Sequence, residues 1–174
     1  MVIVSFLYLN KINNKRLGRD IILNEYMQYA YDEAHTGSSA GEGGPFGAVI
    51  TDTEGRIIAK ARNQVLLRHD PTAHAEIQAI RLAGRTLGTH DLNGCTLYAT
   101  CEPCPMCLSA ILWSNIKRVY YGCNRQDAAE IGFRDAMFYK YFEDKILPEF
   151  SLEQINRDEC LALFVAYKKQ GAIY

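Results

Sequence analysis

The sequence has no excess of charge of one sign, since 19 Lys and Arg against 20 Asp and Glu give a formal net charge of −1 over 174 residues. Non-specific binding to nucleic acid needs a concentrated basic surface, so no nucleic-acid partner is expected. Long apolar runs are also lacking: the opening MVIVSFLYL covers nine residues, whereas a membrane-spanning helix needs about 20. This segment has neither the leading positive charge nor the cleavage site of a signal peptide, so no membrane partner is expected either.

Cysteine is too sparse for a disulfide-stapled secreted scaffold, because six Cys are spread over 174 residues. The protein is therefore expected to be cytoplasmic, with reduced thiols that are free to hold a metal. Cys95, Cys123 and Cys160 are expected to be buried thiols, which behave as small hydrophobes. No repeat, low-complexity tract or linker divides the chain, whose length suffices for one domain with a full core.

Apolar periodicity and breaker residues predict an alternation of helices and strands. Helices are expected over 21–36 (ending at Gly37), 73–87 (ending at Gly88), 105–114, 127–133, 137–144 and 157–169, and strands over 46–52, 56–65, 95–100 and 118–122. A hairpin followed by alternating helices and strands indicates an α/β or α+β sandwich, in which helices cover a mixed sheet. Residues 1–20 are interpreted as an N-terminal extension and residues 21–174 as the domain proper.

The glycine cluster GEGGPFG at 41–47 does not fit a dinucleotide-binding loop. Phe46 occupies a position where that motif needs glycine, and the cluster follows a helix and precedes a strand, the reverse of the required order. A turn in which the backbone passes close to another group is the better interpretation.

A set of metal ligands is suggested by CEPCPMC at 101–107 together with PTAHAE at 71–76. Cys104 and Cys107 lie in the first turn of a predicted helix, where the helix dipole and a metal both favour thiolates. His74, at the start of another helix, is the third candidate. A catalytic zinc ion keeps three protein ligands and one position for water. One Zn²⁺ per subunit is therefore expected, with Cys101 a bystander at the end of a strand.

Glu76 follows His74 by two residues, and at a helix start both side chains can reach one centre. His-x-Glu followed by Pro-Cys-x-x-Cys is the signature of zinc nucleobase deaminases. Water activated by the zinc would attack the ring carbon that bears an amine, with Glu76 as the proton shuttle. The backbone N–H of Ala75 is a candidate donor to a ring carbonyl. A purely structural zinc module is the alternative outside enzymes, although it has no need of Glu76.

These motifs resemble the cytidine deaminase superfamily, and within it the bacterial guanine deaminases. The resemblance rests on GGPFGAVI at 43–50, RNQV at 62–65, DPTAHAEIQAIR at 70–81, CEPCPMCLSAILW at 101–113 and DAAEIGF at 127–133. It implies a three-layer sandwich with a mixed five-stranded sheet. It also implies a homodimer in which the C-terminal helical segment is swapped, and conversion of guanine to xanthine and ammonia.

The same resemblance assigns the substrate residues. Asn63 and Asp135 would hydrogen-bond the purine, Phe46 would stack on it, and Trp113 and Tyr174 would close the pocket, Tyr174 from the partner chain. Asp135 could also relay a proton during loss of ammonia. The alternatives are an ordinary exposed acid for Asp135 and core packing for Trp113.

Other substrates compete within this chemistry. Guanosine would need a pocket opened for ribose, and other aminated rings are possible. Cytosine deaminases of this kind typically have Gly rather than Ala75 between ligand and acid. The tRNA adenosine deaminases resemble the metal motifs, but they have Lys-x-Gly-Ala where this chain has Asp-Ala-Ala-Glu, and they need a basic face.

Overall fold

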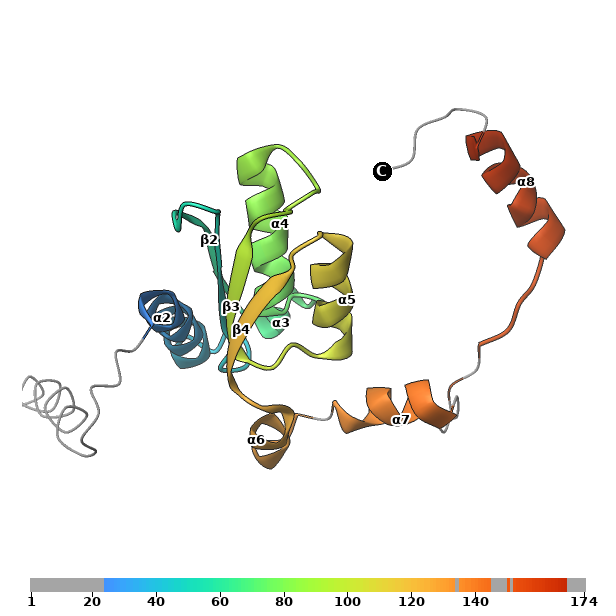
Figure 1. Ribbon diagram of the computed structural model, residues 1–174. Coiled ribbons are helices and arrows are strands. Elements are labelled where there is room, and N and C mark those ends of the chain that lie inside the picture. The colour runs from blue at the N-terminus through green and yellow to red at the C-terminus, as the bar shows by residue number, and fades with distance from the viewer. Residues whose placement is uncertain (1–23, 134, 145–149, 151, 169–174) are drawn as a thin grey trace, which may run out of the picture. The chain divides into compact units, whose positions relative to one another are not determined.

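The computed structural model describes residues 24–133, 135–144, 150 and 152–168 (Figure 1). The chain divides into two compact units, Met1–Phe133 and Arg134–Tyr174, which are treated separately. The predicted extension 1–20 and Tyr174 lie outside the described residues. Among the described helices, none is long and apolar enough to cross a membrane.

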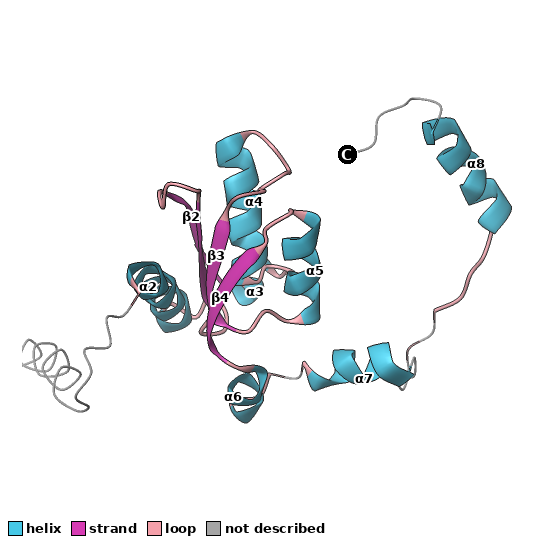
Figure 2. Cartoon of the chain, in the orientation of Figure 1, coloured by secondary structure: helices cyan, strands magenta, loops and turns pink. Residues whose placement is uncertain are grey.

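The first unit is built on a four-stranded mixed sheet in the order β2-β1-β3-β4. Its strands are β1 (Gly47–Thr51), β2 (Ile57–Arg62), β3 (Thr96–Cys101) and β4 (Arg118–Cys123). β1 is antiparallel to β2 and to β3. β3 and β4 are parallel and lie side by side (Figure 2). The prediction of a mixed sheet is confirmed. The expected fifth strand is wrong for the described residues, because directly after β4 Asn124 caps helix α6 (Arg125–Glu130).

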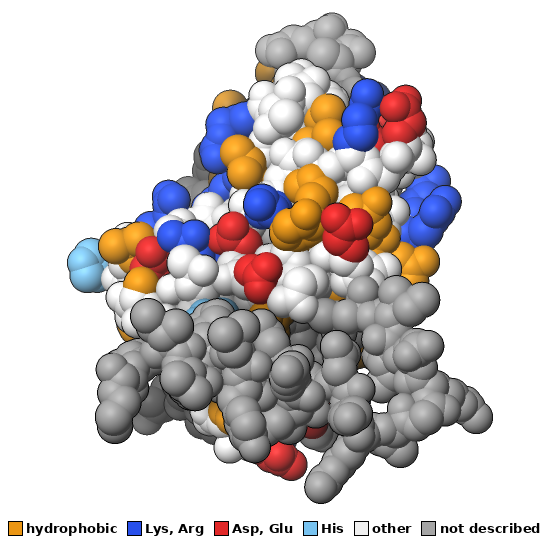
Figure 3. All heavy atoms as spheres, turned by 90° about the vertical axis from the view of Figure 1, so that its left-hand side faces the viewer, with side chains coloured by type: hydrophobic (Ala, Val, Ile, Leu, Met, Phe, Trp, Pro, Cys, Tyr) orange, Lys and Arg blue, Asp and Glu red, His pale blue; other side chains and the backbone are white. Residues whose placement is uncertain are grey.

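Helix α2 (Glu25–Ser39) covers one face of this sheet. Its Ala30 packs with Val49 of β1 and Tyr98 of β3, which point to the same face. On this side of the molecule, the described residues carry interspersed basic, acidic and apolar side chains (Figure 3). The charges therefore do not gather into a patch of one sign on the part of this face that is drawn in colour.

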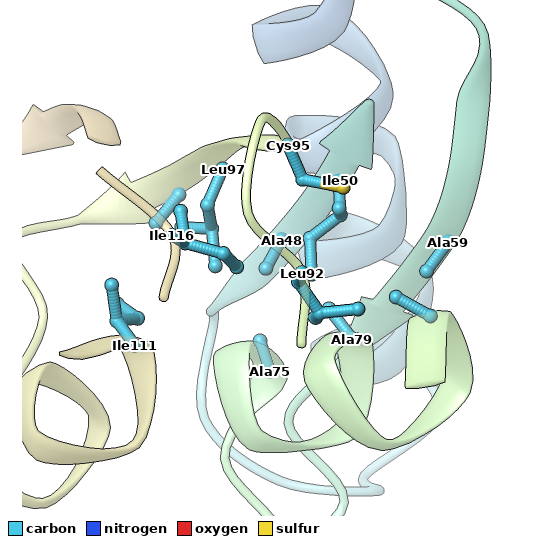
Figure 4. Close-up of a cluster of buried hydrophobic side chains, with 12 residues drawn as sticks. Ala48, Ile50, Ala59, Ala75, Ala79, Leu92, Cys95, Leu97, Ile111 and Ile116 are labelled. Atoms are coloured by element: carbon cyan, nitrogen blue, oxygen red, sulfur yellow. The ribbon is translucent and has the colours of Figure 1, made fainter. Parts of the chain in front are cut away.

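Helices α4 (Ala75–Leu87) and α5 (Pro105–Trp113) cover the opposite face. The main core lies here, where Ala48, Ile50 and Leu97 from the strands meet Ala75 and Ala79 of α4 and Ile111 of α5 (Figure 4). Alternate residues of β1 and β3 thus face the two helical layers, as the period of two in a strand requires. The predicted three-layer α/β sandwich is confirmed.

Several boundaries differ from the sequence prediction by a few residues; α6, for example, covers Arg125–Glu130 instead of 127–133. Two of the differences involve residues in contact with distant parts of the chain. Helix α2 continues past Gly37 to Ser39, and the Arg62 side chain packs so closely on Gly37 that a Cβ there would lie 2.7 Å from it. The predicted second strand ends at Arg62 instead of residue 65. A short helix, α3 (Val65–Arg68), follows it, with the N–H groups of Leu66 and Leu67 bonded to the Glu42 carbonyl.

The second unit contains helices α7 (Ala136–Asp144) and α8 (Arg157–Lys168), close to the predicted ranges.

Three cysteines outside the metal motif were expected to be buried. Cys95 is buried, but Cys123 and Cys160 are exposed, so the prediction is wrong for these two.

Candidate metal centre and active site

Two helix starts bring the predicted ligands together. His74 is the N-cap residue of α4, and Cys104 is the N-cap residue of α5, with Pro105 as the first helical residue. Proline suits that position because its missing N–H would have no partner there. Both helices begin at the end of the sheet at which the parallel strands β3 and β4 finish (Figure 2). Functional sites of α/β sheets are commonly found at this end.

The three side chains form a compact group with one nitrogen and two sulfur donors. His74 Nδ1 lies 3.6 Å from Cys104 Sγ and 3.5 Å from Cys107 Sγ, and the ligand atoms all lie within 4.8 Å of one another. Imidazole and thiolate are the donors that Zn²⁺ prefers, so the residues fit one zinc ion. Cys101 is not part of this group; its Sγ approaches the Asn124 carbonyl at 3.7 Å, so the prediction that Cys101 is a bystander is confirmed.

The two thiols of the centre interact strongly with each other. The pKa of Cys104 falls to about 4, first because Cys107 donates a hydrogen bond to it and also because His74 lies beside it. The pKa of Cys107 is raised, because its proton is held by that hydrogen bond and because the side chain is buried. Cys104 is therefore a buried thiolate at neutral pH, and the thiolate is the form of cysteine that binds metal ions.

Glu76 belongs to the same centre. It lies in the first turn of α4 and is 7% exposed. Burial is the largest cause of the raised pKa of its carboxyl group, which also forms a hydrogen bond with the Cys107 thiol. A buried acid of raised pKa beside a metal-binding group has the properties of a proton-transfer residue.

Asn63 lies directly after β2 and is 3% exposed. Its Oδ1 atom accepts hydrogen bonds from the N–H groups of Gly44 (3.3 Å) and Val65 (3.2 Å). No partner for its Nδ2 group is found among the described residues. An Asn amide can both donate and accept hydrogen bonds, and because Oδ1 is occupied by the backbone, Nδ2 remains as the donor.

The glycine loop reaches the same region, in agreement with its interpretation as a place of close approach. A Cβ on Gly43 would overlap Asn63 Oδ1, and a Cβ on Gly44 would meet the rings of Phe46 and Phe133. Phe46 and Phe133 form an edge-to-face pair with ring centroids 4.7 Å apart. The sequence interpretation gave no role to Phe133, although it lies in the DAAEIGF stretch that carries part of the resemblance.

The other predicted site residues are not brought to the metal centre within the described first unit. Trp113 ends α5, at the opposite end of the helix from Cys104, and its 80% exposure rules out the alternative of core packing. Asp135 belongs to the second unit, where its carbonyl accepts the N–H of Phe138. The roles of Trp113, Asp135 and Tyr174 in a pocket stay predictions.

The fold and the metal centre together place the protein in the class of zinc-dependent hydrolytic deaminases. In this arrangement the zinc ligands lie at the starts of two helices that pack on a mixed sheet. The comparison of sequences agrees, since residues 21–123 match the family described as the cytidine and deoxycytidylate deaminase zinc-binding region. The chain belongs to this family.

Among the relatives in this family to which the chain is similar are two guanine deaminases and a tRNA-specific adenosine deaminase. A guanine deaminase of Bacillus subtilis is 45% identical over 147 residues, which are 82% of this chain and 92% of that protein. Its crystal structure gives a TM-score of 0.78 and covers 84% of this chain and 95% of that one. A structure of a guanine deaminase from Nitrosomonas europaea is 33% identical, with a TM-score of 0.60 over 63% of each chain. A tRNA-specific adenosine deaminase of Buchnera aphidicola is 35% identical over 82% of this chain and 89% of that protein.

Proposed function

We propose that this enzyme hydrolyses guanine to xanthine and ammonia. The observation that carries the proposal is the 45% identity to the Bacillus subtilis guanine deaminase across 92% of that protein. At a similar coverage, the Buchnera aphidicola tRNA-specific adenosine deaminase is only 35% identical. The formal charge of −1 and the interspersed charges on the α2 face (Figure 3) further favour a small substrate over RNA.

His74, Cys104 and Cys107 would hold the zinc ion, which supplies a Lewis acid that lowers the pKa of water at the centre. Glu76 takes a proton from the attacking water and delivers it to the ring nitrogen beside the amine-bearing carbon. It then takes a second proton, from the hydroxyl group that has been added to this carbon, and gives it to the departing amine. The C–N bond breaks, and water and guanine give xanthine and ammonia. Its burial supports this role, because bulk water has little access to compete for the proton.

The purine would be held by groups around this centre. Asn63 donates from Nδ2 to a ring acceptor, because its Oδ1 is engaged by the backbone. The backbone N–H of Ala75 is the first of α4, and such N–H groups have no partner within the helix. It donates to the ring carbonyl. Phe46 stacks on the base, with its ring orientation supported by Phe133. Trp113, Asp135 and the Tyr174 of the partner subunit complete the pocket.

We extend the proposal to assembly and location. The enzyme forms a homodimer in which the C-terminal segments are exchanged. Exposed apolar side chains on α8 support this arrangement: Leu163 is 70% exposed, Phe164 71% and Val165 51%, and exposed apolar patches commonly mark association surfaces. A reducing compartment such as the cytoplasm suits the free thiols of the centre. Size-exclusion chromatography with light scattering measures the mass of the full-length protein in solution. We expect twice the mass of one chain, which is 19.7 kDa, and the mass of a single chain would contradict the dimer.

The experiment that tests the reaction uses zinc-loaded protein, protein treated with a chelator, and the chelator-treated protein after zinc is returned. We expect guanine to disappear and xanthine and ammonia to form in equal amounts with zinc, to stop without it, and to resume when it returns. Formation of inosine in tRNA with guanine left intact would favour the tRNA adenosine alternative instead.

A further inference from the structure

A single carboxylate, that of Glu42, binds the two residues that flank Asn63. Arg62, which precedes Asn63, donates from Nε (2.8 Å) and Nη2 (3.0 Å) to the two oxygens of Glu42. Gln64, which follows Asn63, donates from Nε2 to Glu42 Oε2 at 2.9 Å. Two parallel hydrogen bonds between a guanidinium and a carboxylate fix orientation as well as distance.

The backbone around Glu42 holds the same turn. Its carbonyl accepts the N–H groups of Leu66 and Leu67, each at 3.0 Å. The two residues after Glu42 are the glycines that meet Asn63 Oδ1, Gly43 by close contact and Gly44 by its N–H. The orientation of the Asn63 amide therefore depends on where Glu42 holds the glycine loop against the end of β2.

The turn is also joined to the metal centre. The backbone N–H of Gln64 donates to the carbonyl of Ala73 at 2.9 Å, and Ala73 immediately precedes the ligand His74. A continuous path of hydrogen bonds thus runs from Glu42 through Gln64 to the segment that carries His74. On the other side, Glu33 of α2 binds Nη1 of Arg62 at 3.0 Å and anchors the guanidinium to the opposite helical layer.

We propose that Glu42 is a positioning residue for substrate binding: it orients Asn63 so that Nδ2 faces the purine at a fixed distance from the metal centre. This inference rests on the proposed role of Asn63 as a purine donor. Glu42 itself does not touch the reacting atoms. Its carboxylate acts only through the turn of residues 62–64.

The enzyme offers a control in the turn that joins β1 to β2, at the opposite end of these strands from Asn63. There Asp52 accepts hydrogen bonds from the N–H groups of Glu54 and Arg56 and from Arg56 Nε, at 2.7 to 2.9 Å. This carboxylate–guanidinium pair stabilises a turn without any contact to Asn63. The Arg62 side chain is 28% exposed and that of Arg56 70%, so Glu42→Gln should lose more stability than Asp52→Asn, and the melting temperature is measured for both. A rise of KM through loss of positioning is expected only for Glu42→Gln.

The test compares steady-state kinetics on guanine for both zinc-loaded variants, with zinc content and melting temperature as controls. In Glu42→Gln, we expect KM to rise about tenfold with kcat changed by less than about twofold, because binding common to ground state and transition state is lost. Asp52→Asn should keep the wild-type KM. In an Asn63→Ala background, Glu42→Gln should add almost nothing to KM, since the two residues act through one interaction.

Equal KM values for Glu42→Gln and wild type, or fully additive effects in the Asn63→Ala background, would overturn the proposal. Should Glu42→Gln fail to fold, Gln64→Ala keeps the ion pair and removes one of the flanking bonds. We then expect a rise of KM of about threefold, and no rise would count against the inference.

A measurement that needs no turnover separates this inference from the proposed function. The side-chain amide resonance of Asn63, assigned by its loss in Asn63→Ala, can be followed by NMR in the zinc-loaded protein. We expect Glu42→Gln to shift or broaden it and Asp52→Asn to leave it in place. If guanine is not a substrate, this result still decides whether Glu42 orients Asn63, and an unchanged resonance would refute that role.

Discussion

Replacing Glu76 with Gln should abolish turnover while leaving the zinc centre in place. Glu76 is 7% exposed, and its carboxyl group is hydrogen-bonded to the Cys107 thiol. Gln fills the same space but is neither an acid nor a base near neutral pH, and little bulk water can substitute for the missing carboxyl group. General acid–base catalysis contributes about 10²–10⁴-fold, which corresponds to about 3–5 kcal/mol of activation free energy. We expect kcat to fall by at least about a hundredfold.

The assay follows xanthine formation from guanine by absorbance, with ammonia measured in the same samples. Zinc content should stay at one ion per chain, and the melting temperature should not fall, because an amide avoids the cost of a buried charge. Glu25→Gln is the matched control, since Glu25 is also in the first turn of a helix but lies outside the centre; it should keep full activity. Glu76→Gln with zinc bound and more than about a tenth of wild-type kcat would refute the reasoning.

Other substitutions test the remaining parts of the site. Cys107→Ala should lose zinc, as measured by metal analysis, whereas Cys101→Ala should keep it because Cys101 is outside the ligand group; equal zinc in both would contradict the assignment. Gly43→Ala should displace the Asn63 amide, raise KM for guanine and lower the free energy of unfolding by about 1–3 kcal/mol, and wild-type kinetics would count against the contact. Arg62 and then Gln64 lower the pKa of Glu42 from 4.5 to about 2. A carboxyl group whose pKa is lower in the folded than in the unfolded protein stabilises the fold at pH values above the unfolded-state pKa. This stabilisation is lost as the pH falls toward the folded-state pKa. The difference in unfolding free energy between wild type and Glu42→Gln, measured in urea, should therefore be full above pH 4.5 and shrink toward pH 2; a constant difference would refute it.

The metal centre could be predicted from the sequence because local signals determine it. Asp70-Pro71-Thr72 and Pro105 start the two helices at which His74 and Cys104 become N-cap residues. The spacing of His74 to Glu76 and of Cys104 to Cys107 then brings the side chains off the open helix ends. Such short-range determinants can be read along the chain without knowledge of the tertiary fold.

The features that could not be predicted from the sequence depend on contacts between residues that are far apart in the chain. The glycine expected to end the first helix, Gly37, lies within it, and its lack of a side chain leaves room for the distant Arg62 side chain. The orientation of the Asn63 amide follows from Gly44, which lies 19 residues away in the sequence. The hydrogen bonds of Glu42 to Arg62 and Gln64 span 20 and 22 residues. No periodicity or motif encodes these pairs, so the positioning of the substrate donor emerged only from the structure.

The central claim is tested most directly by ammonia release from zinc-loaded protein with guanine, guanosine, cytosine and adenine compared side by side. The account predicts that guanine is turned over with the highest kcat/KM and that xanthine forms in equal amount. Preferred turnover of guanosine, cytosine or adenine would contradict the assignment of the substrate. Absence of ammonia from all four, with one zinc ion bound per chain, would contradict the assignment of a nucleobase deaminase.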